Sequence, residues 1–430
     1  MALHSVPFSD PPVRFSGRQK PLLWIDRYVG VPICWGLTLG RRLAFWTRSR
    51  GRPPAPQRVL LLKLAEQGSS VLAFAALQAA AQRFGRENVY FMAFEENRFI
   101  VDLLGLIPPE NVITVETTSA GVMVASGWRE LRGLRRRRID ACIDMEFFTR
   151  FSAAIAFLSG ARIRVGFHTF FGEGPYRGDL FTHRLLYNPH LHTSDTFLSL
   201  VAALDVDPAQ LPTFDYTPPP WQPLPLFAAA PEEVAQVRAA AAAWGVTPGS
   251  RLVLLNANAS DLLPLRKWAQ ENYAALAERL VAANPDLVVA FTGSPEEAAG
   301  IAALVCRIGS PRCVSVAGQT TLRQLLVLYG QAQVLVTNDS GPAHFAALTA
   351  VDVVTLFGPE TPLLFAARGP RNHALWAGIA CSPCVNAFNS RQSVCRNNVC
   401  MQALTVDHVL ATVQTILARR VAPAPVPPTS

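Results

Sequence analysis

Polar residues that could bind an anion follow an apolar strand predicted at residues 334–337. A tight turn comes next, and a helix is predicted to begin near Pro342 with Ser340 as its N-cap. The first amides of such a helix are unpaired and, together with the helix dipole, attract a phosphate group. An ordinary capped turn between a strand and a helix would share this pattern. The residues that could contact the anion are Asn338, Asp339, Ser340, Gly341 and His344.

Two other predicted strands of this half, at residues 252–257 and 287–292, also end in polar residues. Ligands of open α/β sheets bind at the carboxyl ends of the strands, so three polar strand ends in one sheet favour a ligand site. Glu296 or Glu297 could accept hydrogen bonds from a ribose or sugar hydroxyl, or the pair could simply complement the dipole of the next helix. The further candidates for this site are Asn258, Ser260, Arg266, Lys267 and Glu296.

The elements that must position these side chains alternate between strands and helices. This alternation predicts βαβ units, two parallel sheets with right-handed crossovers, and two similar α/β halves facing each other across a cleft. The predicted strands are residues 58–64, 88–94, 111–116 and 141–145, and then 252–257, 287–292, 313–317, 334–337 and 353–357. The predicted helices of the C-terminal half are residues 271–283, 295–308, 321–330, 341–349 and 406–418.

A proline-rich stretch, residues 208–231, divides the chain and predicts a linker, because it can sustain neither a helix nor a central strand. A chain of 430 residues is also too long for one ordinary core. The expected division is a basic and aromatic segment at 1–56, a first domain at 57–207, a linker at 208–235, a second domain at 236–403, a helix at 404–420 and a disordered tail at 421–430.

The net charge of +8 is distributed unevenly, with basic residues crowded at the N-terminus. Such a block favours anionic partners, and an anionic membrane is the expected one, because no recognisable nucleic-acid module accompanies the charge. The apolar stretch at residues 28–40 is too short to span a bilayer, which takes about 20 residues. Residues 22–46 predict instead an interfacial segment or one that packs on the first domain. No secretory signal stands at the start, so a cytoplasmic location is expected. The alternative is a cytoplasmic protein in peripheral contact with the inner face of the cytoplasmic membrane. The aromatic residues suited to a headgroup boundary are Trp24, Tyr28, Trp35 and Trp46.

Four cysteines near the end of the second domain have the spacing C-x2-C-x10-C-x4-C. A four-thiolate zinc site is physically possible, but the spacing between the pairs is short and the second pair is loose. A buried thiol cluster and a disulfide formed on oxidation are the alternatives, and we favour a structural role near the hinge between the domains. The residues are Cys381, Cys384, Cys395 and Cys400.

These segments together resemble the heptosyltransferase-like family 9 glycosyltransferases, which are GT-B proteins that handle lipopolysaccharide and related sugars. The resemblance runs from about residue 58 to about residue 418, and residues 266–268, 292–297 and 337–344 and the four cysteines carry it. It implies an ADP-activated sugar bound in the second domain by Asp339, Ser340, Gly341 and His344. Arg266, or else Lys267, would neutralise the phosphate charge as the leaving group departs. No metal or other cofactor is implied.

The loop after the first strand departs from the family pattern. The family typically has a Gly-Asp pair there, and its aspartate is the general base on the acceptor hydroxyl. In this chain Gly68 is followed by Ser69, and a serine accepts a proton poorly at neutral pH. Glu66 is the candidate base, although it could instead cap the next helix, with catalysis lost or carried by another group. Lys63 is available for an acidic acceptor or a donor phosphate.

The expected function is therefore transfer of a heptose-like sugar from a nucleoside-diphosphate sugar, with inversion, to a saccharide or glycolipid acceptor. Two alternatives stay open. One is a nucleotide-sugar epimerase or hydrolase of the same fold, and the other is a non-catalytic nucleotide-sugar-binding protein derived from a transferase.

Overall fold

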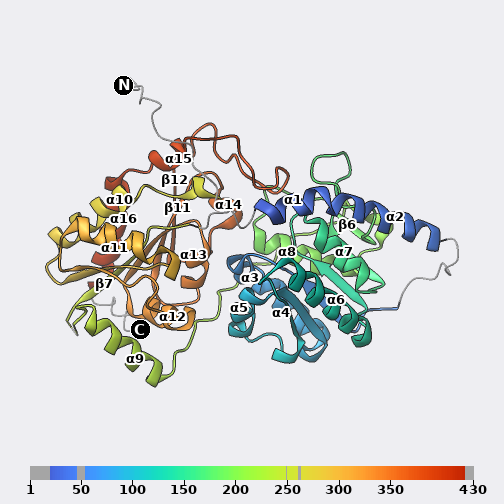
Figure 1. Ribbon diagram of the computed structural model, residues 1–430, viewed down its shortest axis with the longest axis horizontal. Coiled ribbons are helices and arrows are strands. Elements are labelled where there is room, and N and C mark those ends of the chain that lie inside the picture. Colours follow the sequence, from blue (N-terminus) through green and yellow to red (C-terminus); the bar gives the residue numbers. More distant parts are fainter. Residues whose placement is uncertain (1–19, 46–53, 248, 260–262, 422–430) are drawn as a thin grey trace, which may run out of the picture.

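The structure, a computed structural model, describes residues 20–45, 54–247, 249–259 and 263–421. Within these ranges the chain forms two parallel sheets of six strands, one in each half (Figure 1). Ser260, Trp46 and residues 422–430 of the predicted tail lie outside the described residues.

The first sheet has the strand order β3-β2-β1-β4-β5-β6. Along β1 the side chains alternate between two cores, because successive residues of a strand point to opposite faces: Val59 and Leu61 enter one cluster, and Leu60 and Leu62 enter the other. The strands are β1 (Val59–Leu62), β2 (Val89–Phe94), β3 (Val112–Val115), β4 (Ala141–Asp144), β5 (Ile163–Phe167) and β6 (His183–Leu185).

Helices cover both faces of this sheet. One face carries α3 (Gln67–Leu72), α4 (Phe74–Phe84), α5 (Arg98–Leu104) and α8 (Thr193–Ala202). The other face carries α6 (Ala120–Arg137) and α7 (Arg150–Leu158).

The second sheet has the order β12-β11-β10-β7-β8-β9, which repeats the doubly wound order of the first sheet when its strands are counted from β7. Its strands are β7 (Arg251–Asn256), β8 (Leu287–Phe291), β9 (Cys313–Ser315), β10 (Val334–Asn338), β11 (Asp352–Phe357) and β12 (Asn372–Trp376). Its helices are α9 (Pro231–Ala243), α10 (Gln270–Ala283), α11 (Ala298–Ile308), α12 (Leu322–Gln331), α13 (Gly341–Ala346), α14 (Pro362–Phe365), α15 (Val399–Gln402) and α16 (Val406–Val421).

The predicted fold of two Rossmann-like halves is confirmed, and so are the nine predicted strands. Three strands, β5, β6 and β12, were missed by the sequence reasoning. Each contains polar residues or glycine, and β6 has only three residues, so none has the apolar run that indicates a central strand. Between the halves, residues 211–230 contain no helix or strand, and α9 begins at Pro231.

Two helices precede the first sheet, α1 (Lys20–Tyr28) and α2 (Gly30–Phe45), and they lie along the N-terminal half beside α7 (Figure 1). Asp26 accepts hydrogen bonds from the first amides of α7, at 2.9 Å from Arg150 N and 3.1 Å from Phe151 N. Cys34 is fully buried. The expectation that this segment packs on the first domain is therefore confirmed. No helix in the described part of the chain is long and apolar enough to cross a membrane.

Candidate functional site

The three polar strand ends predicted for the C-terminal half come together, because β10, β7 and β8 are neighbours in the sheet. A methyl group placed on Gly293, after β8, would lie 3.4 Å from Asn258 Nδ2, after β7. The buried Asn258 Nδ2 and His344 Nδ1 have no hydrogen-bond partner. Buried polar atoms in folded proteins are normally paired, so unpaired ones gathered at strand ends are typical of a ligand site.

The turn after β10 is built differently from the prediction. The Asn338 side chain is fully buried and engaged at both ends: its Oδ1 accepts from Trp268 N at 3.0 Å, and its Nδ2 donates to Asn258 O at 3.1 Å. It therefore joins two strand ends, which corrects the expectation that it contacts the ligand. Ser340 is the N-cap residue of α13, but its hydroxyl donates to Asn338 O and makes no capping hydrogen bond.

A buried cluster of opposite charges lies beside this turn. Arg266 Nη1 is 3.5 Å from Glu360 Oε2 and 3.8 Å from Asp339 Oδ2. Burial, and then the neighbouring Asp339 carboxylate, raise the pKa of Glu360 well above its ordinary range. Burial thus favours the protonated form of Glu360, and the Arg266 guanidinium contacts both carboxyl groups.

Glu360 was missed by the sequence reasoning, although a signal existed. It follows β11 in the sequence Gly358-Pro359-Glu360, so it is a fourth polar residue after a strand of this sheet. The other two predicted candidates occupy less central positions. Glu296, which follows β8, is exposed, and Lys267 is half-buried. Glu297, the neighbour of Glu296, accepts a hydrogen bond from Ser294 N at 2.8 Å and so caps the turn.

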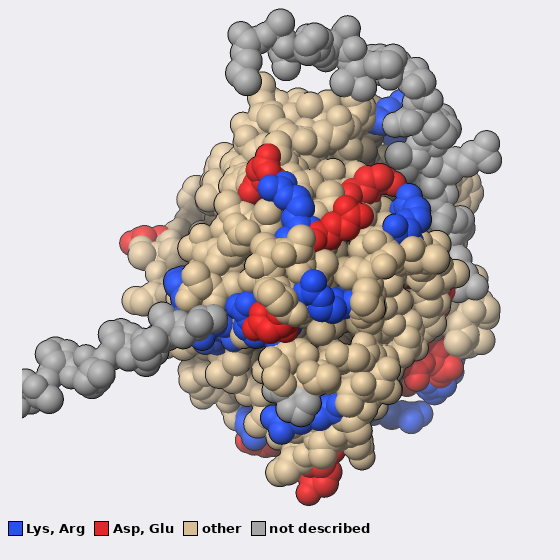
Figure 2. Space-filling view, turned by 90° about the vertical axis from the view of Figure 1, so that its left-hand side faces the viewer, with Lys and Arg blue, Asp and Glu red and all other residues tan. Residues whose placement is uncertain are grey.

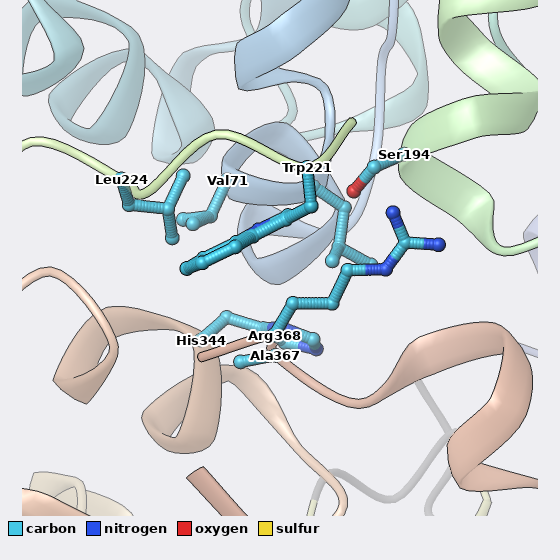
Figure 3. Close-up of a pocket in the computed structure, with 8 residues that line it drawn as sticks. Val71, Ser194, Trp221, Leu224, His344, Ala367 and Arg368 are labelled. Carbon is cyan, nitrogen blue, oxygen red and sulfur yellow. The ribbon is translucent and has the colours of Figure 1, made fainter. Parts of the chain in front are cut away.

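The start of α13 faces the start of α3 across the boundary between the halves. A methyl group on Gly68 would lie only 2.5 Å from His344 Cδ2, so glycine is what allows this close approach. Burial lowers the pKa of His344, which is therefore a neutral imidazole at pH 7. Next to this contact is a pocket lined by both halves, in which the Trp221 indole lies between α3 and His344 (Figure 3).

The loop before α3 holds Glu66 in a strained backbone conformation with φ 68°, which is uncommon outside glycine. The side chain does not cap α3, so the capping alternative is wrong. Its Oε2 accepts from Ser69 Oγ at 2.9 Å, and its Oε1 pairs with Arg391. A non-glycine residue in this region costs about 1–3 kcal/mol, and such strain clusters at functional sites.

Lys63 does not have the predicted role. It is completely buried, with Nζ donating to Ala65 O at 2.7 Å and to Glu146 Oε1 at 3.1 Å. The same Glu146 oxygen accepts from Leu64 N at 2.7 Å and Ala65 N at 3.0 Å. Lys63 and Glu146 therefore fix the shape of the loop, and the ammonium group is not exposed to an acceptor or donor.

Arg391 connects the two halves of the site. Its Nε is 3.0 Å from Glu360 Oε1, and its guanidinium also pairs with Glu66 from the other half. The loop that carries it is anchored on the N-terminal half by Phe388, whose ring is 5.3 Å from Tyr187 and 5.6 Å from Phe148. Nothing in the sequence around Arg391 indicated this role, because its partner Glu66 is 325 positions away.

A second connection between the halves involves His192. Its Nδ1 accepts from Ser194 N at 3.2 Å, so its Nε2 carries the proton and donates to Ala366 O at 2.9 Å. Asp195 and Arg368 form a bidentate ion pair beside it, at 3.0 and 2.5 Å. Burial lowers the pKa of His192 to about 4.

This histidine predicts a loss of stability in mild acid. In the unfolded chain a histidine titrates near pH 6.5, so between pH 6.5 and 4 the unfolded state binds a proton that the folded state does not. From pH 7 to pH 5 this site should lower the free energy of unfolding by about 2 kcal/mol. Denaturant unfolding of wild type and His192→Asn, whose side chain can still cap α8, measures the difference. Parallel pH curves for the two proteins would contradict the assignment.

The four clustered cysteines are all free thiols. Cys400 is buried, and the half-buried Cys384 and Cys395 pack against Leu263 and Leu265. Among the described residues, no group of three or more His, Cys, Asp or Glu side chains is arranged to hold a metal ion. The geometry thus lends no support to zinc at Cys381, Cys384, Cys395 and Cys400, and the apolar contacts agree with packing beside the Arg266 loop.

Comparisons with known proteins agree with this architecture. The sequence model of glycosyltransferase family 9 (heptosyltransferase) matches residues 128–394, more than half of the chain. The lipopolysaccharide core heptosyltransferase OpsX of Haemophilus influenzae is 25% identical over 313 residues, which are 72% of this chain and 81% of that protein. Lipopolysaccharide heptosyltransferase 2 of Salmonella typhimurium is 32% identical over 102 residues, 23% of this chain, and the match spans only 29% of that relative.

Among solved structures, the Escherichia coli ADP-heptose lipopolysaccharide heptosyltransferase II aligns with a TM-score of 0.63 at 17% identity, over 85% of this chain and 100% of that one. A family 9 glycosyltransferase from Veillonella parvula aligns with a TM-score of 0.64 at 18% identity, over 84% of this chain and 97% of that one. These likenesses show the fold, which is the predicted GT-B arrangement. With the family match over residues 128–394, they lead to one conclusion: the chain belongs to glycosyltransferase family 9, the heptosyltransferase family.

Proposed function

We propose that this chain is an inverting, metal-independent glycosyltransferase that moves a heptose-like sugar from an ADP-sugar to a saccharide or lipid-linked acceptor. The observation that carries the proposal is the paired Arg266, Asp339 and Glu360 at the strand ends, placed opposite Glu66 across the boundary between the halves. The names of the relatives favour a lipopolysaccharide sugar, and the name of the solved E. coli relative favours ADP as the nucleotide.

On the donor side, Arg266 would neutralise the β-phosphate as the bond from the anomeric carbon to the phosphate oxygen breaks. The neutral His344 and the amide of Asn258 would donate hydrogen bonds to phosphate or sugar oxygens. Asp339, Ser340 and Gly341 would shape the turn around the diphosphate, with Glu296 and Lys267 at its edge. Glu360 would lie beside Arg266 at the diphosphate, with burial favouring its protonated form.

On the acceptor side, Glu66 would take the proton of the acceptor hydroxyl while that oxygen attacks the anomeric carbon from the face opposite the phosphate, so the configuration inverts. Gly68 and Ser69 shape the acceptor side of this loop. In the structure Glu66 is paired with Arg391, so the carboxylate becomes available when the donor diphosphate attracts that guanidinium. Arg391 would thereby couple donor binding to activation of the base.

We propose that residues 57–207 form the acceptor side and residues 236–403 the donor side. A cytoplasmic location agrees with a nucleotide-sugar donor.

The experiment measures release of nucleoside diphosphate from ADP-heptose, UDP-glucose and GDP-mannose, with and without a lipopolysaccharide-core acceptor. Acceptor-dependent release of ADP together with a glycosylated product is the expected result. Release that is equal without acceptor would replace the proposal by a hydrolase or epimerase. Thermal stabilisation by a nucleotide sugar with no release under either condition would indicate a binding protein.

A further inference from the structure

Helix α2 presents two apolar faces, and only one of them is packed. Cys34 and Thr38 are buried against the N-terminal half, whereas Trp35, Leu39 and Leu43 are 62%, 44% and 66% exposed. These three residues are spaced by four, so they form one stripe along the helix. On α1, Trp24 and Tyr28 are 59% and 55% exposed, with ring centroids 5.0 Å apart. We call Trp24, Tyr28, Trp35, Leu39 and Leu43 the aromatic face.

The aromatic face is held rigidly by the contacts beneath it. Asp26, at the end of α1, is 3.1 Å from Arg150 Nη1 in addition to its bonds to the α7 amides. Thr38 Oγ1 accepts from Asp179 N at 2.9 Å, and Arg41 pairs with the Asp179 carboxylate. Single exposed apolar residues are normal on a soluble protein, but five large ones on two consecutive, well-anchored helices indicate an interaction surface.

The charge around the aromatic face identifies its partner. Residues 1–52 contain nine basic and two acidic residues, a net charge of +7 out of +8 for the whole chain, and leave only +1 for the rest. Within the described part, Arg27 and Arg42 are exposed on these two helices. By contrast, the outer side of the C-terminal half shows acidic and basic side chains interspersed (Figure 2). A second copy would bring two strongly positive segments together, whereas an anionic lipid surface complements them.

We propose that the aromatic face lies on the surface of an anionic bilayer, with its Trp and Tyr rings at the headgroup level and its basic residues on acidic lipids. This inference rests on the proposed function, because docking on a membrane would serve sugar transfer only if the acceptor is linked to a lipid. Asp26 on α1 caps the start of α7, and α7 follows the carboxyl end of β4. Helices α1 and α2 therefore lie near the carboxyl ends of the strands of the acceptor-side sheet. A lipid-linked acceptor would then reach the site without leaving the membrane.

Co-sedimentation of the full chain with vesicles tests this docking, and it uses no nucleotide sugar. We expect the chain to pellet with phosphatidylcholine vesicles that contain phosphatidylglycerol, and much less with phosphatidylcholine alone or at high salt. The variant Trp35→Glu/Leu39→Glu should bind at least about tenfold more weakly, because it removes two large apolar side chains from the lipid contact.

Trp128→Glu is the matched control. Trp128 is 52% exposed on α6, which packs on β3 at the edge of the sheet opposite β6, and its replacement should leave vesicle binding unchanged. Equal pelleting of wild type and Trp35→Glu/Leu39→Glu, or equal pelleting with neutral and anionic vesicles, would overturn the proposal. A third result would also overturn it: the wild type forms a dimer in analytical ultracentrifugation and does not bind vesicles, and this variant is a monomer. Turnover with a soluble acceptor sugar is measured separately, so failure of docking and failure of the proposed transfer are distinguishable.

Discussion

Glu66→Gln is expected to lower the rate of sugar transfer by about 10³-fold or more, because a positioned general base contributes about 10²–10⁴-fold. Glutamine keeps the size and the hydrogen bond from Ser69, but it cannot take the acceptor proton. Donor affinity should be at least that of wild type, since the proposed donor site lies on the other half of the chain and Arg391 no longer has to leave a carboxylate when the diphosphate binds. The measurements are kcat with a lipopolysaccharide-core acceptor and the thermal shift produced by ADP.

A double variant distinguishes loss of the base from loss of structure. Ser69 occupies the position of the aspartate that family members typically carry, and its hydroxyl is 2.9 Å from Glu66 Oε2. Ser69→Asp in the Glu66→Gln background should therefore return part of the activity by restoring a carboxylate on the same loop. Ser69→Ala alone should cost only a few-fold, because one hydrogen bond contributes about 1 kcal/mol. Full activity in Glu66→Gln would remove this residue from the mechanism.

Most of the fold and half of the site could be predicted from local sequence, because both depend on short-range patterns. Apolar runs that end in small polar residues identify β7, β8 and β10, and neighbouring parallel strands necessarily bring their carboxyl ends together. That reasoning places Asn258, Arg266 and Asp339 correctly in one region.

What could not be predicted depends on pairs that are distant in sequence. Lys63 looks available when read alone, yet Glu146, 83 positions later, draws it into the interior. Glu66 reads as a free carboxylate, yet Arg391 reaches it from the other half. Asn338 reads as a ligand contact, yet its amide joins Trp268 to Asn258. In each case the partner that decides the surroundings of the side chain is too distant in sequence to be recognised from the local pattern.

Arg266→Ala is expected to lower kcat by about 10²–10³-fold, the usual cost of removing one group that stabilises charge developing in the transition state. KM for the donor should change less, since the guanidinium matters most as the diphosphate departs. Arg266→Lys should recover part of the loss, because it restores the charge but not the planar fork that binds phosphate at two points. Steady-state kinetics with ADP-heptose and a core acceptor measures all three proteins.

The matched control is Arg420→Ala. Arg420 is 2.7 Å from Asp352 Oδ2, and Asp352 begins β11, so this ion pair lies at the amino end of the same sheet, away from the proposed donor site. Its replacement should leave kcat unchanged. Arg266→Ala has a further signature, because Asp339 would lose its nearby cation. Binding of the anionic donor should then weaken by repulsion, and neutral sugars should be unaffected. If kcat is unchanged in Arg266→Ala, the leaving group is stabilised elsewhere, and Arg391 is the other guanidinium that contacts Glu360.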